Sequence, residues 1–117
     1  MYENGPYHVI EPITTSPPAL YHNTFTWNNQ TNMLWLESPC GVGFSYCDSA
    51  AGLRHNDTST AGDNLAALVA FYTAFPELYS SPLYITGESY AGVYVPTLAQ
   101  AILNYNHNPR PLPLQGE

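Results

Sequence analysis

The strongest constraint on the fold is the stretch "PLYITGESYAGVYVPTLAQAILNY", residues 82–105. Residues 82–86 have the β-branched and aromatic content of a strand. The residues after Ser89 are compatible with a helix to about Tyr105, with Pro96 producing a kink or a restart. Between them, "GESYAG" has the character of a G-x-S-x-G turn, whose glycines make room for a strained backbone. The stretch therefore predicts a strand, a sharp turn that exposes a serine hydroxyl, and a helix.

A second helix is predicted upstream, in "TAGDNLAALVAFYTAF". It begins near Thr60, whose spacing to Asp63 fits a capping box. Its apolar residues recur at helical spacing and fall on one face. Pro76 ends the helix, because the residue before a proline, Phe75, is pushed out of the helical region.

The rest of the chain completes an alternation of strands and helices. Residues 32–38, "NMLWLES", form a compact apolar run of strand length and predict a buried strand. Residues 1–31 are predicted to be loop or short irregular strands, and the glycine-rich residues 40–52 an extended, tightly turning loop. On composition alone, the proline-rich tail after Tyr105 is a linker or a disordered end. The fold class is therefore α/β.

Charge excludes several classes of partner. The chain has 117 residues, which fits one domain or part of one. Nine acidic residues stand against only Arg54 and Arg110, so the formal charge is −7. We therefore expect no nucleic-acid partner and no binding to an anionic membrane surface. No apolar run approaches the ~20 residues of a transmembrane helix, and the first residues do not resemble a signal peptide.

Two cysteines and two sequons leave the cellular compartment open. Cys40 and Cys47 could close a short disulfide, pair with partners outside the chain, or remain free. Asn29 ("NQT") and Asn56 ("NDT") are candidate glycosylation sites, which have meaning only in a secreted protein.

Ser89 is the candidate nucleophile. A serine on a strand-to-helix turn lies at a helix N-terminus, where the N–H of Tyr90 could stabilise a developing oxyanion. The activating groups are expected after the serine, first an acid and then a histidine. Downstream of Ser89 the sequence contains His107, followed by one acid, Glu117, so this order is not completed within the chain. Three further histidines precede the serine, and surface or structural roles suit them better: His8, His22 and His55.

Three motifs in this order, "ENGPY", "SPCGVGFSY" and "GESYAGVYVP", resemble the serine carboxypeptidases, the α/β-hydrolase peptidases that include cathepsin A. The resemblance covers essentially all 117 residues. It implies that residues 1–117 are part of a single α/β-hydrolase domain, truncated at both ends, with an incomplete, mostly parallel sheet and flanking helices. It also implies short strands within residues 1–31 and a strand in "PLPLQGE".

The resemblance implies roles for four residues. Ser89 would attack the carbonyl of the last peptide bond and form an acyl-enzyme, and Tyr90 would supply a backbone oxyanion donor. Glu88 would help bind the C-terminal carboxylate of a peptide substrate. Glu3 would share a proton with Glu88, because two crowded carboxyl groups do not both ionise easily. A preference for acidic conditions follows, and no cofactor or metal is implied.

The resemblance also implies a setting and leaves alternatives. A lysosomal, vacuolar or secreted protein would make a Cys40–Cys47 disulfide plausible. The family's "NGGPG" segment and its downstream aspartate and histidine are not in this sequence. The chain is therefore expected to be a fragment of a working peptidase or a short non-catalytic product. An acyltransferase of the same fold is a third reading, although Glu88 favours a peptidase because such acyltransferases commonly carry aspartate there.

Overall fold

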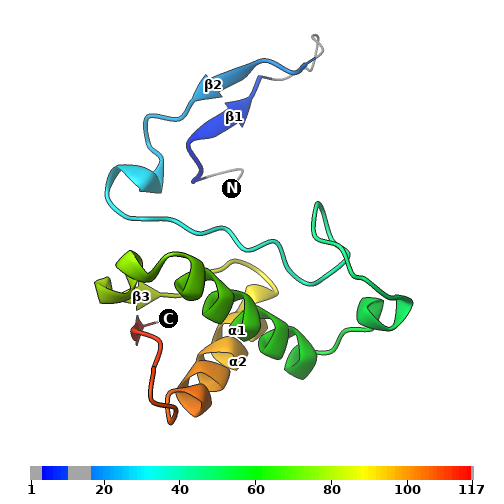
Figure 1. Ribbon diagram of the computed structural model, residues 1–117. Coiled ribbons are helices and arrows are strands. Elements are labelled where there is room, and N and C mark those ends of the chain that lie inside the picture. The colour runs from blue at the N-terminus through cyan, green and yellow to red at the C-terminus, as the bar shows by residue number, and fades with distance from the viewer. Residues whose placement is uncertain (1–3, 11–16, 117) are drawn as a thin grey trace. The chain divides into compact units, whose positions relative to one another are not determined.

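The structure is a computed structural model that describes residues 4–10 and 17–116 (Figure 1). It divides the chain into two compact units, residues 1–36 and 37–117. None of the helices within the described residues is long and apolar enough to cross a membrane.

The first unit is built on a short antiparallel hairpin. Strand β1 (Tyr7–Val9) pairs with β2 (Leu20–His22), with Tyr7 opposite His22 and His8 opposite Tyr21. Both cross-strand pairs bring two rings into contact. The rings of Tyr7 and His22 meet edge to face with centroids 5.9 Å apart, and those of His8 and Tyr21 are stacked with centroids 5.2 Å apart. Such aromatic pairs stabilise a sheet by a few tenths to about 1 kcal/mol each. The expectation of short strands within residues 1–31 is confirmed.

Asn4 organises the remainder of this unit. Its carbonyl accepts hydrogen bonds from the Trp27 N–H (3.1 Å) and the Thr26 hydroxyl (3.0 Å). Its side-chain oxygen accepts from the indole N–H of Trp35 at 3.0 Å. A short 3₁₀ helix, η1 (Trp27–Asn29), follows directly, capped by the Thr26 side chain. The "NGP" turn is therefore held by residues more than twenty positions away in the sequence.

The predicted buried strand at residues 32–38 is wrong. The segment belongs to no strand, and the side chains of Leu34 and Leu36 are 46% and 43% exposed. An apolar run becomes a buried strand only when neighbouring strands complete its hydrogen bonds and cover its faces. Within the described residues, no strand pairs with this segment.

Helix α1 (Asp57–Ala74) begins earlier than the sequence predicted. Asn56, and not Thr60, is the N-cap, and it forms a reciprocal capping box with Ser59. The Asn56 side chain accepts from the Ser59 N–H at 2.8 Å, and the Asn56 N–H donates to the Ser59 hydroxyl at 3.0 Å. Thr60 instead lies inside the helix, 2% exposed. The predicted end is confirmed, because Phe75 leaves the helical region with φ −125° and ψ 65° before Pro76.

The second unit contains a parallel strand–helix–strand connection. Strand β3 (Leu83–Tyr84) leads through α2 (Ala91–Tyr105) to β4 (Leu114–Gly116), which pairs with β3 in parallel. The predicted strand, helix and Tyr105 boundary are confirmed, as is the strand in "PLPLQGE". The α/β-hydrolase sheet itself is larger than two strands, so these elements agree with part of that fold and do not establish it.

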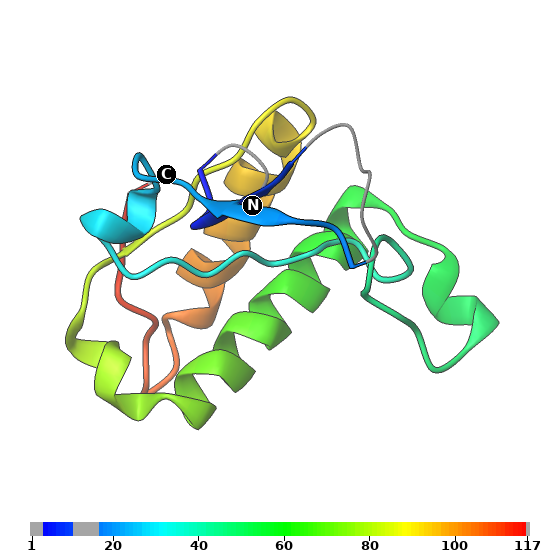
Figure 2. The same cartoon turned by 90° about the horizontal axis from the view of Figure 1, so that it is seen from above.

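The core of this unit lies between α1 and α2, which pack against each other; α1 crosses in front of α2 in Figure 1, and Figure 2 shows the pair from above. Ile102 is fully buried at its centre. The other buried members come from both helices and from the segment before β4: Leu68, Tyr72, Leu98 and Leu112. Two 3₁₀ helices, η2 (Ala50–Leu53) and η3 (Pro76–Ser80), flank α1.

Residues 106–116 of the proline-rich tail are ordered, contrary to their composition. The side chain of Asn106 bridges the turn, accepting from the Leu112 N–H at 2.7 Å and donating to the Leu112 carbonyl at 2.9 Å. The Tyr79 hydroxyl donates to the Arg110 and Pro111 carbonyls at 3.0 and 2.7 Å. These bonds satisfy backbone groups that the prolines leave without helix or sheet partners.

Candidate active site

Ser89 occupies a strained backbone position between β3 and α2. Its φ is +58°, and among the described residues it is the only non-glycine with a positive φ. An L-residue in the left-handed region costs of order 1 kcal/mol or more and persists only where surrounding structure enforces it, often at functional sites. The turn is closed by two backbone bonds, Ala91 N–H to Glu88 carbonyl (3.0 Å) and Gly92 N–H to Ser89 carbonyl (2.9 Å). The predicted sharp turn before the helix is therefore present.

Gly87 is the glycine that this turn requires. A Cβ at this position would lie 2.4 Å from the Cβ of Ala91 and 3.1 Å from Cγ2 of Val95. Reading the motif as G-x-S-x-G needs a correction, because the residue two positions after the serine is Ala91 and the second glycine, Gly92, comes one later. A Cβ on Gly92 would meet no atom within 4 Å. Only the first glycine has a steric reason at this turn.

The turn leaves the groups for nucleophilic attack accessible. Ser89 and Glu88 are exposed. The backbone N–H of Tyr90 makes no hydrogen bond to any described residue, while its carbonyl accepts from the Val93 N–H at 2.9 Å. An unpaired N–H one residue after a serine hydroxyl, at the start of a helix, is suited to bind a negatively charged oxygen.

The surface beside the turn is an open apolar groove. Residues from the end of β3 and from the first turns of α2 line it: Ile85, Thr86, Gly87, Ala91, Gly92, Val95 and Pro96. The serine therefore stands at the edge of a surface able to accept further chain or a ligand.

A general base is not found among the described residues, where the Ser89 hydroxyl makes no hydrogen bond. The histidines upstream have other contacts. His8 stacks on Tyr21, and His22 meets Tyr7 edge to face. Nε2 of His55 lies 2.6 Å from the Cys40 carbonyl oxygen. His107 is exposed after α2. The part of the chain that the structure describes thus holds a candidate nucleophile, Ser89, and a candidate oxyanion donor, the Tyr90 N–H. It also holds no group of three His, Cys, Asp or Glu side chains that could bind a metal ion.

Sequence reasoning missed Asp57, which contacts this turn. The Tyr90 hydroxyl donates to Oδ1 of Asp57 at 3.2 Å, and this bond to a carboxylate raises the pKa of Tyr90 above its ordinary value. The two residues are 33 positions apart, so no local pattern links them. The sequence contained no other signal, because the predicted helix began near Thr60 and left Asp57 outside it; the structure places Asp57 in the first turn of α1.

Glu3, the predicted partner of Glu88, lies outside the described residues. Its neighbour Asn4 is held firmly within the first unit by Trp27, Thr26 and Trp35. Sharing of a proton between Glu3 and Glu88 stays a prediction.

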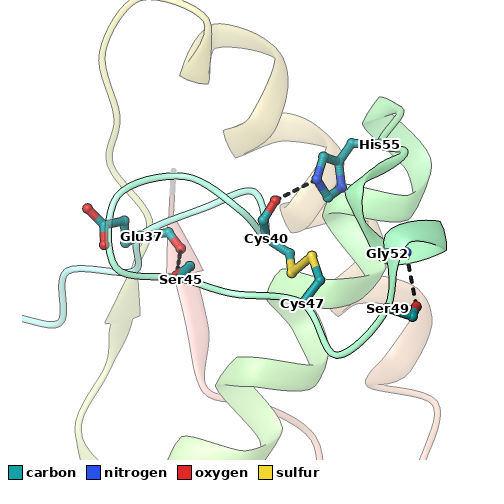
Figure 3. Close-up of a disulfide and its surroundings, with 7 residues drawn as sticks. All are labelled: Glu37, Cys40, Ser45, Cys47, Ser49, Gly52 and His55. Carbon is teal, nitrogen blue, oxygen red and sulfur yellow. Dashed lines mark hydrogen bonds between the residues drawn. A yellow bond between two sulfur atoms is a disulfide. The ribbon is translucent and has the colours of Figure 1, made fainter.

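A disulfide joins Cys40 and Cys47, with their Cα atoms 5.7 Å apart (Figure 3). The loop it closes turns through Gly41 and Gly43, both at positive φ, of 90° and 53°. Glu37 organises the same loop, since its carboxylate accepts from the Phe44 N–H at 2.6 Å and its carbonyl accepts from the Ser45 hydroxyl, as Figure 3 shows. A Cβ on Gly43 would overlap this carboxylate.

The two candidate glycosylation sites differ in their contacts. Both asparagines are exposed. The amide Nδ2 of Asn29 donates to the Thr24 carbonyl at 2.7 Å. Asn56 uses only its side-chain oxygen, to cap α1, so its amide nitrogen remains available. Glycosylation of either residue stays a prediction.

Comparison with known proteins shows the family to which the chain is similar. The family model for serine carboxypeptidases matches residues 1–116. In Arabidopsis thaliana, the chain is 42% identical over 108 residues to serine carboxypeptidase-like 21, covering 92% of this chain and 22% of that protein. It is 46% identical over 109 residues to serine carboxypeptidase-like 40, covering 92% and 21%, and 51% identical over 88 residues to serine carboxypeptidase-like 35, covering 74% and 18%.

The chain belongs to the serine carboxypeptidase family. It spans about a fifth of the length of the curated relatives it matches. The family implies the α/β-hydrolase fold, to which the strand–turn–helix around Ser89 conforms.

Proposed function

We propose that the protein carrying this chain is a serine-type carboxypeptidase that removes C-terminal residues from peptides, with Ser89 as its nucleophile. The observation that carries the proposal is the backbone of Ser89, an exposed serine at φ +58°, followed at the start of α2 by a Tyr90 N–H that no described residue accepts. Family membership supports hydrolase chemistry at this serine.

The reaction follows from these two groups and a base supplied by another part of the protein. The Ser89 hydroxyl oxygen attacks the carbonyl carbon of the last peptide bond as the base removes its proton. The carbonyl oxygen becomes an oxyanion and accepts a hydrogen bond from the Tyr90 N–H. The C–N bond then breaks, and the leaving amine takes up the proton. Water hydrolyses the acyl-enzyme by the same steps in reverse order and releases the shortened peptide.

Recognition of the free C-terminus is the part that would make this a carboxypeptidase. In the proposal, Glu88 and Glu3 share a proton, and the protonated carboxyl group donates a hydrogen bond to the substrate's carboxylate. Loss of the shared proton would place two negative charges against the substrate's own. Activity is therefore expected to fall as the pH rises. An acidic compartment, lysosomal or vacuolar, or secretion into an acidic medium, would suit such an enzyme.

The test is C-terminal release from a pair of peptides that differ only in a free or an amidated C-terminus. The full-length protein should release the last residue of the free peptide and act poorly on the amide. Ser89→Ala should abolish release, whereas the control Ser80→Ala, an exposed serine after α1, should not change it. Transfer of an acyl group to an alcohol without peptide hydrolysis would contradict the proposal in favour of an acyltransferase.

A further inference from the structure

Tyr90 is tied to the structure through its side chain as well as its backbone. Its ring is 57% exposed, yet its hydroxyl is hydrogen-bonded to Asp57 at the start of α1. The ring also meets Tyr94 edge to face, with ring centroids 5.0 Å apart and planes at 71°. An exposed tyrosine without such contacts would sample several rotamers. Asp57 of α1 and Tyr94 of α2 together restrict the position of the Tyr90 side chain.

Asp57 is itself in a fixed place. It is the first residue of α1 and lies within the capping box, between Asn56 and Ser59. The residue before that box, His55, binds the carbonyl of disulfide-bonded Cys40 (Figure 3). The carboxylate that receives the Tyr90 hydroxyl is thus carried by a capped helix end that is tied to the disulfide loop.

We propose that Asp57 is a positioning residue for the reaction at Ser89, because it holds the phenol of Tyr90 and thereby the backbone N–H that receives the oxyanion. The inference rests on the proposed roles of Ser89 and Tyr90. Ser89 has a positive φ, a conformation that persists only where the surrounding structure enforces it, and Tyr90 is the next residue in the chain. Asp57 does not touch the reacting atoms. It limits the conformations of the peptide unit between Ser89 and Tyr90.

A second role of Asp57 has to be separated from this one. A carboxylate in the first turn of a helix also interacts favourably with the helix dipole, whatever Tyr90 does. Tyr90→Phe breaks the contact and leaves Asp57 on its helix. Asp57→Ala removes both effects, and Asp57→Asn keeps a side-chain oxygen that can accept the phenol.

The experiment compares these variants in the full-length protein. Asp57→Asn creates an additional Asn-Thr-Ser sequon, so every variant is produced in a host that attaches no N-glycans. The first measurement is the second-order rate constant for phosphonylation of Ser89 by a fluorophosphonate, in which the serine oxygen displaces fluoride from phosphorus, together with kcat and KM for a peptide substrate. Asp63→Ala, which removes an exposed carboxylate from the same helix, is the matched control.

We expect Tyr90→Phe and Asp57→Ala each to lower the phosphonylation rate constant and kcat about three- to tenfold. This factor corresponds to the free energy of one hydrogen bond. KM should change little, because an oxyanion donor acts in the transition state. The double variant should be no slower than either single variant, and Asp57→Asn should recover most of the loss. Asp63→Ala should match the wild type.

Three results would each overturn the inference while leaving the proposed function intact. The first is phosphonylation of Ser89 at the wild-type rate in Tyr90→Phe. The others are rate reductions that multiply in the double variant, and changes confined to KM. A wild-type protein that the fluorophosphonate does not label at Ser89 would overturn the proposed function and the inference together.

A second readout tests the contact without activity. In ¹³C-tyrosine NMR, with the Tyr90 signal assigned by its loss in Tyr90→Phe, the phenol should titrate at lower pH in Asp57→Asn than in the wild type. The reason is that the Asp57 carboxylate raises the pKa of Tyr90. An unchanged titration would show that the contact is not made in solution, and the inference would fail.

Discussion

Replacement of Gly87 by alanine tests whether the Ser89 turn has the geometry described above. The added Cβ would lie 2.4 Å from the Cβ of Ala91 and 3.1 Å from Cγ2 of Val95. Carbon atoms in ordinary contact are about 3.5–4.0 Å apart, so the first pair must separate by about 1 Å or more. The Cβ of Ala91 is fixed to the first residue of α2 and has no rotamer with which to move aside. The turn must therefore move relative to the helix.

The expected cost of this displacement appears in both activity and stability. A misplacement of about 1 Å at a reacting group can slow a reaction about 100-fold, and overpacking typically costs about 1–3 kcal/mol of folding free energy. We therefore expect Gly87→Ala to slow phosphonylation of Ser89 by a fluorophosphonate by one to two orders of magnitude. The assay is the rate of appearance of the labelled peptide, measured beside the free energy of unfolding.

Gly92→Ala is the matched control, five residues later. Its Cβ would meet no atom within 4 Å, and the position lies in the first turn of α2. Alanine there should be neutral or stabilise the helix by up to about 1 kcal/mol. Equal rates of Ser89 phosphonylation in Gly87→Ala and Gly92→Ala would refute the steric reasoning.

Three further predictions concern the second unit. Ile102→Ala should lower the free energy of unfolding by about 2–5 kcal/mol in chemical denaturation, because the side chain is fully buried, whereas Leu103→Ala, 56% exposed, should cost much less. Ser59→Ala should cost about 0.5–1 kcal/mol by removing half of the capping box, and it leaves the Asn56 sequon intact for comparison of glycosylation by mass. Tyr72→Phe should reduce the loss of folding stability above about pH 10. Burial raises the pKa of Tyr72, so this tyrosine ionises first in the unfolded chain, which is thereby stabilised relative to the folded protein as the pH rises. Identical profiles of stability against alkaline pH in the wild type and the variant would contradict this.

The elements that the sequence predicted correctly are those set by local chemistry. The residues after Ser89 were compatible with a helix to Tyr105, and α2 ends there. The end of α1 follows from Pro76, which acts on the residue directly before it. The strained serine followed from the order strand, glycine, serine, helix.

The failures concern choices that depend on distant residues or on competing local ones. Residues 32–38 have the composition of a buried strand, but a strand forms only with a partner, and the described residues provide none. Both Asn56 and Thr60 are acceptable N-caps, and the burial of Thr60 in the packed helix decided between them. The contact of Asp57 with Tyr90 depends on how α1 and α2 pack, which no local pattern encodes.

The tail shows how far composition can mislead. Its prolines predicted disorder, but Asn106 and Tyr79 satisfy its backbone carbonyls and N–H groups from neighbouring elements. The resemblance to the family indicated a strand there, and β4 confirms it.

The most direct test of the account is fluorophosphonate labelling of a lysate of the source cells, followed by mass analysis of every labelled protein that contains the peptide "GESYAGVYVP". We predict a labelled protein several times heavier than the 12.9 kDa of this chain, with the probe attached to Ser89. A protein that contains this peptide but stays unlabelled, or carries the probe on another residue, would contradict the claim that Ser89 is a catalytic nucleophile.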